Sequence, residues 1–166
     1  GEDASVNIIE QSGGGDSDTV ETTLGDGASA YELPSEVEVL RYLGGSPFEG
    51  LGNASDNTIY GNVGNDTLSG GSGDDTLFGG TGADTLQGEA GNDTFIVGDV
   101  TFGFTGQETE LTGGVGDYAS DTVSGGAGID TLRFQVRGLD STDVLEINSN
   151  TTDVERLLLL NDEGMS

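Results

Sequence analysis

The sequence contains no cysteine, histidine, tryptophan or lysine, and its basic side chains are four arginines. Without cysteine or histidine the chain cannot form a disulfide, a thiolate nucleophile, a serine or cysteine catalytic triad, or a zinc site built from nitrogen and sulfur. Its longest apolar run, Leu157 to Leu160, is far shorter than the roughly 18 residues that span a bilayer, so we expect no membrane insertion. Oxygen is therefore the only kind of ligand that this chain can offer a metal.

Acidic side chains dominate the charge, with 31 Asp and Glu and a formal net charge of -27. Nucleic acids and anionic lipid surfaces bind through Lys and Arg that neutralise phosphate, so both are poor partners for this chain. High charge with only 32% hydrophobic residues is also typical of disordered chains. A disordered chain, however, has no periodic apolar positions.

A repeat of nine residues excludes that interpretation. Five units follow one another without a gap over residues 52–96, and each begins with glycine. Position seven is always Thr, position eight is Ile, Leu or Phe, and position six is Asp except at Asn57. The units read GNASDNTIY, GNVGNDTLS, GGSGDDTLF, GGTGADTLQ and GEAGNDTFI, starting at Gly52, Gly61, Gly70, Gly79 and Gly88.

Less regular units flank this run. The triplet of Asp, Thr and an apolar residue recurs at Asp18, Asp121 and Asp130, within units that begin at Gly13, Gly116 and Gly125. The spacing of the repeat is therefore maintained, in weaker form, toward both ends of the chain.

These units resemble the calcium-binding nonapeptide of the RTX (repeats-in-toxin) or haemolysin-type family, G-G-x-G-x-D-x-U-x. The resemblance implies an all-β fold, a right-handed parallel β-roll in which two units form one coil of 18 residues. It also implies calcium ions between stacked turns, and export of the unfolded chain from Gram-negative bacteria through type I secretion.

The residue types suit calcium for physical reasons. Glycines at positions one, two and four permit tight turns with positive φ and leave backbone carbonyls uncovered. Calcium takes six to eight oxygen ligands at about 2.3 to 2.6 Å, which carbonyls and an aspartate can supply, whereas magnesium sheds its water reluctantly. The β-branched Thr favours a short strand after each turn, with position eight facing inward.

By resemblance, position-six residues 18 apart share an ion between their turns, with carbonyls from positions one and three of the earlier turn and two and four of the later. The pairs are Asp66 with Asp84, Asp75 with Asp93 and, weakened by the asparagine, Asn57 with Asp75. The first site takes the carbonyls of Gly61, Val63, Gly80 and Gly82, and the second those of Gly70, Ser72, Glu89 and Gly91. If residues 97–115 loop out of the roll, Asp84 stacks with Asp121 and Asp93 with Asp130.

We expect one structural domain in four segments. Residues 1–51 form an N-terminal degenerate repeat and β cap, 52–96 the regular roll, 97–115 a loop insertion, and 116–166 degenerate repeats with a C-terminal β cap. Caps keep the open ends of a solenoid soluble and monomeric. Strands are predicted at 37–42, 131–136 and 154–159.

The predicted function is that of a calcium-binding β-roll module of a larger secreted or cell-surface bacterial protein, folding on calcium outside the cell and carrying no active site. Two alternatives stay open. The chain is an adhesin or carbohydrate-binding appendage, for which Phe102 and Phe104 are candidate sugar contacts, or it is the C-terminal module of a secreted hydrolase or epimerase whose catalysis lies elsewhere.

Overall fold

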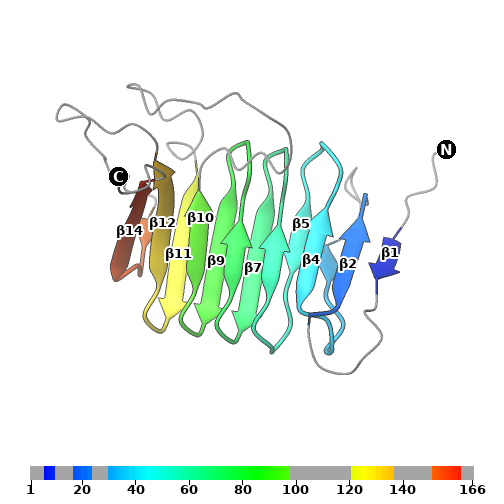
Figure 1. Ribbon diagram of the computed structural model, residues 1–166, viewed down its shortest axis with the longest axis horizontal. Coiled ribbons are helices and arrows are strands. Elements are labelled where there is room, and N and C mark those ends of the chain that lie inside the picture. Colours follow the sequence, from blue (N-terminus) through cyan, green and yellow to red (C-terminus); the bar gives the residue numbers. More distant parts are fainter. Residues whose placement is uncertain (1–5, 10–16, 24–29, 98–120, 137–150, 162–166) are drawn as a thin grey trace, which may run out of the picture.

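The chain forms two parallel β-sheets that face each other. The computed structural model describes residues 6–9, 17–23, 30–97, 121–136 and 151–161, and within these residues every regular element is a strand. In Figure 1 the strands stand side by side along the long axis of the molecule. The eight-stranded sheet contains, in order, β1 (Val6–Ile9), β2 (Thr19–Thr22), β4 (Val39–Tyr42), β6 (Thr58–Tyr60), β8 (Thr76–Phe78), β10 (Thr94–Val97), β12 (Thr131–Val136) and β14 (Arg156–Asn161). The six-stranded sheet contains β13 (Thr151–Thr152), β11 (Thr122–Ala127), β9 (Thr85–Ala90), β7 (Thr67–Ser72), β5 (Glu49–Leu51) and β3 (Tyr31–Glu32).

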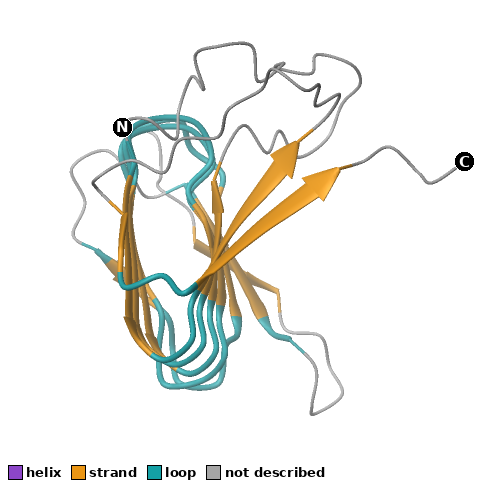
Figure 2. Cartoon of the chain, turned by 90° about the vertical axis from the view of Figure 1, so that its left-hand side faces the viewer, coloured by secondary structure: helices purple, strands orange, loops and turns teal. Residues whose placement is uncertain are grey.

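Successive repeats contribute strands to alternate sheets, so two repeats make one coil. Leu77 therefore pairs with Ile59 on one side and with Phe95 on the other, each 18 residues away. All the described pairings are parallel except that of β1 with β2. Seen along the stack in Figure 2, the coils lie behind one another as nested loops. The parallel β-roll and its 18-residue coil, predicted from the nonapeptide, are confirmed.

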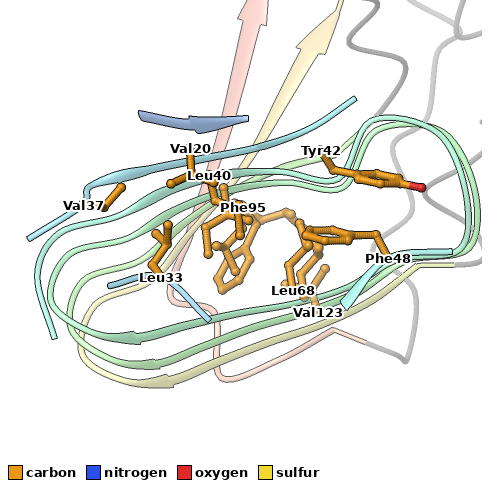
Figure 3. Packing of buried hydrophobic residues seen from close by; sticks show 13 residues of the cluster. Val20, Leu33, Val37, Leu40, Tyr42, Phe48, Leu68, Phe95 and Val123 are labelled. Atoms are coloured by element: carbon orange, nitrogen blue, oxygen red, sulfur yellow. The ribbon is translucent and has the colours of Figure 1, made fainter. Parts of the chain in front are cut away.

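Position eight of the repeat fills the space between the sheets. Its side chains are fully buried, and each contributes about 1.5 to 3 kcal/mol of burial free energy. Figure 3 shows members of this cluster meeting between the two layers. The position-eight residues of the regular run are Ile59, Leu68, Leu77, Leu86 and Phe95.

The flanking segments continue the same two sheets. Val20 and Leu40 are fully buried in line with position eight. Tyr42 and Phe48 stack face to face inside the roll, with ring centroids 4.4 Å apart (Figure 3). The strands predicted from 37 and 154 begin instead at Val39 and Arg156, because the residues before them belong to turns.

The sequence separation of paired strands is largest between the regular run and the C-terminal repeats. β11 pairs with β9, and β12 with β10, at a separation of 37 residues rather than 18. Val97, expected in the insertion, still pairs with Phe134 in the sheet. Most of the predicted insertion, including Phe102 and Phe104, lies outside the described residues. Within the described part of the chain there is no helix long and apolar enough to cross a membrane.

Candidate calcium sites

The position-six residue of each repeat ends its turn and immediately precedes a strand. The chain passes from the turn into the sheet at this residue, so its side chain is enclosed by the turns of adjacent coils. From Asn57 to Asp130, at most 2% of each such residue is exposed, whereas Asp18 of the first, less regular unit is half-buried. We call the aspartates of this set the carboxylate ladder: Asp66, Asp75, Asp84, Asp93, Asp121 and Asp130.

One oxygen of each ladder carboxylate holds the backbone of the preceding coil. Asp75 Oδ1 accepts a hydrogen bond from the N–H of Asn57 at 2.7 Å, and Asp93 Oδ1 accepts one from Asp75 at 2.9 Å. The same bond crosses the 37-residue separation, where the amides of Asp84 and Asp93 donate to Asp121 and Asp130. The structure thus stacks Asp84 with Asp121 and Asp93 with Asp130.

The second carboxylate oxygen carries the observation most relevant to a metal. Oδ2 of Asp66, Asp75, Asp93 and Asp130 is buried and has no hydrogen-bond partner. An ionised carboxylate in such a place is costly unless a cation neutralises it. The oxygens therefore suit a hard cation such as calcium, which needs no hydrogen to bind them.

The pKa values of the ladder carboxyls also support binding of a cation. Burial raises the pKa of Asp66 to about 7, against a hydrogen bond from the Phe48 amide that lowers it, and the Asp84 carboxylate raises it further. Burial likewise raises the pKa of Asp75 to about 7. The pKa values of Asp93 and Asp130 are also raised, first by burial and then by neighbouring carboxylates. Without a counter-ion, the folded chain therefore disfavours the charged form of these carboxyls.

The glycine at position one faces the same oxygens. A Cβ placed on Gly61 would lie 2.5 Å from Asp66 Oδ2 and 2.6 Å from the carbonyl oxygen of Gly79 in the next coil. On Gly88 it would lie 2.2 Å from Asp93 Oδ2 and 2.5 Å from the Gly125 carbonyl oxygen. A side-chain oxygen and a backbone carbonyl thus converge on one small space in each turn. Carboxylate and backbone carbonyl oxygens are the ligands that calcium takes, so the chemistry of these residues fits the ion.

The carbonyl residues predicted for the first site lie in one pair of stacked turns. Val63 forms a parallel bridge with Thr81. Gly80 and Gly82 have φ of +100° and +133°, and a Cβ on either would overlap the carbonyl oxygen of Asn62 or Gly64. The close approach explains why these positions are glycine.

The residues predicted for the second site are also brought together. Ser72 pairs with Ala90, next to Glu89 and Gly91, in the adjacent coil. Glu89 has a φ of +77° although it is not glycine, and Gly91 packs its Cα against the carbonyl of Gly73. Direct ligation by either set of carbonyls remains a prediction. The sequence reasoning did not single out the position-one carbonyls of the later turns, which face the ladder oxygens.

The turn at Asn57 is built differently from the others. Asn57 Oδ1 accepts from the Asn53 amide at 2.7 Å, while its side-chain N–H donates to the Val37 carbonyl at 3.3 Å. The Asn53 side chain donates to the carbonyls of Pro34 and Val37 at 2.6 and 2.8 Å. We call this arrangement the amide-closed turn. The hydrogen-bond donors in this turn are neutral N–H groups. The side-chain oxygen of Asn57, predicted to be a weaker metal ligand, already accepts the hydrogen bond from the Asn53 amide.

Two glutamates outside the nonapeptide run take the place of the ladder aspartate. The Asp18 amide donates to Glu38 Oε2 at 2.8 Å, and the Asp130 amide donates to Glu155 Oε2 at 2.9 Å. The sequence predicts strands at both glutamates and indicates no role for them. Their similar settings, Glu36-Val37-Glu38 and Asp153-Val154-Glu155, were the available indication. No group of three acidic side chains in the described residues forms a metal cluster by itself.

A parallel roll with buried carboxylates in its turns is the architecture of a calcium-binding β-roll. The model of the RTX calcium-binding nonapeptide repeat matches the chain at residues 51–77, 69–99 and 111–133, in four copies. The chain therefore carries RTX calcium-binding nonapeptide repeats, and calcium is the metal that these repeats bind. No curated protein and no solved structure matches the chain.

Proposed function

We propose that this chain is a calcium-folded β-roll module of a larger secreted or cell-surface protein, which orders and stiffens where calcium is abundant. The observation that carries the proposal is the row of buried Oδ2 atoms that lack hydrogen bonds at Asp66, Asp75, Asp93 and Asp130. Position eight of each regular repeat buries one large apolar side chain, worth about 1.5 to 3 kcal/mol. That is less than the conformational entropy lost by ordering nine residues, so we expect metal binding to drive folding.

Export of the chain in an unfolded state fits the same coupling of folding to calcium binding. RTX proteins typically leave the cell through type I secretion, and low cytosolic calcium would keep such a chain unfolded until it reaches the outside. We propose that residues 1–51 and 116–166 cap the roll within one domain, with 97–115 as an insertion. The described strands of both flanks extend the same two sheets, which supports this division.

The test is a calcium titration of the EDTA-stripped chain followed by far-UV circular dichroism, with magnesium as the control. A cooperative transition from coil to β structure in calcium, absent in magnesium, supports the proposal. A metal-free chain that is already fully β at neutral pH, or one that stays unfolded in calcium, contradicts it.

A second candidate function, recognition of a glycan or cell surface by this module, is favoured by one feature of the eight-stranded sheet. A cavity of about 270 Å³ is lined by residues that include Arg41, Tyr60 and Phe78. The two rings stack with centroids 4.4 Å apart, and the Arg41 guanidinium lies 5.0 Å from the Tyr60 ring centroid. Aromatic rings beside a cation are a common setting for polar ligands.

This second candidate is tested by glycan-array binding of the calcium-loaded chain. Binding that is lost in Tyr60→Ala but retained in Leu158→Ala, which changes an exposed apolar residue elsewhere on the same sheet, supports it. Absence of glycan binding in the wild type leaves the first function standing alone. Any catalytic activity of the parent protein is proposed to lie outside this module.

A further inference from the structure

The last described coil, residues 151–161, is not a nonapeptide unit, and the family match ends at residue 133. Its strands β13 and β14 nevertheless pair in parallel with β11 and β12. Before the turn, the paired residues Val123 and Thr151 are 28 residues apart in the sequence. After the turn, the paired residues Thr131 and Arg156 are only 25 apart. The turn between β13 and β14 is therefore shorter than the glycine-rich turn before Asp130, and it carries Asp153 and Glu155 instead of glycines.

This short turn covers a buried carboxylate. Asp130 is 0% exposed, and its Oδ1 accepts a hydrogen bond from the Asp93 amide at 2.7 Å. Its Oδ2 is buried without a hydrogen-bond partner. The last coil thus places two more acidic groups beside an oxygen that already lacks a positive partner.

The space beside Asp130 has the same form as in the regular repeats. A Cβ on Gly125 would overlap both Asp130 Oδ2 and the carbonyl oxygen of Asp153. At Gly88, the corresponding oxygens are Asp93 Oδ2 and the carbonyl of Gly125. The Asp153 carbonyl therefore stands where a position-one glycine carbonyl stands in a regular coil. Asp153 adopts a φ of +54°, an uncommon conformation for a residue other than glycine or asparagine.

We propose that Asp130 Oδ2, the backbone carbonyl of Asp153 and the Glu155 carboxylate form a further calcium site, one coil beyond the last nonapeptide. Glu155 is held over the site because its Oε2 accepts the Asp130 amide at 2.9 Å. The proposal rests on the proposed function in one respect, that the ladder binds calcium.

The site has a structural consequence. Leu157 and Leu158 of β14 are 48% and 43% exposed, so this strand has limited apolar burial to hold it on the roll. An ion shared between the turns at Gly125 and Asp153 would join the last coil to the ladder. Calcium at this site therefore fastens β14 to β12, so that β14 covers the edge of β12.

The test compares Glu155→Gln with Glu38→Gln in the whole chain. Glutamine keeps an oxygen that accepts the amide of the preceding coil but removes the charge that calcium prefers. Glu38 is a matched control because it makes the same hydrogen bond, to the Asp18 amide, where Asp18 is only half-buried. Bound calcium is counted by native mass spectrometry across a titration, and circular dichroism confirms that each variant folds in saturating calcium.

We expect Glu155→Gln to bind about one ion fewer, or to weaken one ion by about tenfold, with Glu38→Gln equal to the wild type. Hydrogen exchange of a peptide covering 151–161 gives a second measurement, in which calcium should slow exchange less in Glu155→Gln. Equal binding and exchange in Glu155→Gln and wild type overturn the site alone, as does an equal loss in both variants. A wild type that binds no calcium overturns the proposed function as well.

Discussion

The amide-closed turn and the carboxylate ladder have similar backbones but opposite side-chain chemistry. In the amide-closed turn, the Asn53 and Asn57 side chains donate N–H groups to carbonyls of the preceding coil. In the ladder, residues at the same position as Asn57 are carboxylates, which only accept hydrogen bonds when ionised. The first arrangement satisfies the carbonyls within the protein, whereas the second needs a cation.

The two kinds of turn have the same backbone hydrogen bond. The Asn57 carbonyl accepts from the N–H of Thr76, as the Asp66 and Asp75 carbonyls accept from Thr85 and Thr94. Because the backbone is shared, side chains decide whether a coil depends on metal. We expect the coils around Asn53 and Asn57 to tolerate calcium removal better than those that contain the ladder.

The largest expected effect is that of Asp75→Ala. This change removes a proposed calcium ligand and leaves the buried Asn57 amide without its acceptor. The free energy of unfolding in saturating calcium should fall by about 3 to 5 kcal/mol, measured by urea denaturation. The control is Asp74→Ala, which removes the neighbouring, exposed carboxylate and its surface hydrogen bonds from Asn92, and should cost only about 1 kcal/mol. Equal losses in the two variants would show that burial in the ladder has no special role.

Acid should partly replace calcium in the metal-free chain. The pKa of Asp66 and Asp75 is about 7 in the folded state against 3.8 ordinarily, so the unfolded chain releases these protons first as pH rises. Their contribution to stability is fully present below about pH 3.8 and is lost as pH rises through 7. Circular dichroism in EDTA should therefore show more β structure at pH 4 than at pH 7.5, with sedimentation used to exclude aggregation. If β structure does not increase at pH 4, the buried carboxyls do not oppose folding through their negative charge.

Replacing the Asn57 amide with a carboxylate should make the amide-closed turn depend on metal. Asn57→Asp replaces the donor to the Val37 carbonyl with a charged acceptor, so the metal-free chain should lose about 1 to 3 kcal/mol of stability. In calcium the new carboxylate resembles the ladder, and part of the loss should be recovered. Thermal unfolding with and without calcium measures both effects. A loss that is the same in calcium and in EDTA would contradict the comparison.

The smallest expected effect separates strain from hydrogen bonding at Asn62. This residue has a φ of +77°, and its side chain donates to the Gly44 carbonyl at 2.9 Å. Both Asn62→Ala and Asn62→Gly lose that bond, but glycine adopts positive φ freely. Asn62→Gly should therefore be about 1 kcal/mol more stable than Asn62→Ala, as judged from chemical denaturation. The reverse order would mean that the positive φ is not a source of strain.

The fold was predictable because one strict period controls both its core and its turns. Position eight must be apolar to fill the space between the sheets, and position six must be acidic for calcium, so both positions can be identified in the sequence. Glu38 and Glu155 were missed because they lie outside that period and reach the preceding coil with a longer side chain. The donor role of Asn57 was missed because its spacing is that of a ligand, and only the structure shows which side-chain atom faces Val37.

The stacking across the 37-residue separation was predictable only as a conditional statement. The sequence shows two further units after the insertion, but nothing in it fixes whether they rejoin the same roll. Parallel pairing of Leu86 with Val123 and of Phe95 with Leu132 supplies that information. Long-range register of this kind depends on packing between distant segments, which local pattern does not encode.

The most direct test of the account is a crystal structure of the calcium-loaded chain with anomalous diffraction data that locate calcium. We expect anomalous peaks at coordination distance, about 2.3 to 2.6 Å, from Oδ2 of Asp66, Asp75, Asp93 and Asp130. Calcium bound only at exposed carboxylates such as Asp74, with these Oδ2 atoms protonated or hydrogen-bonded to water, would contradict it.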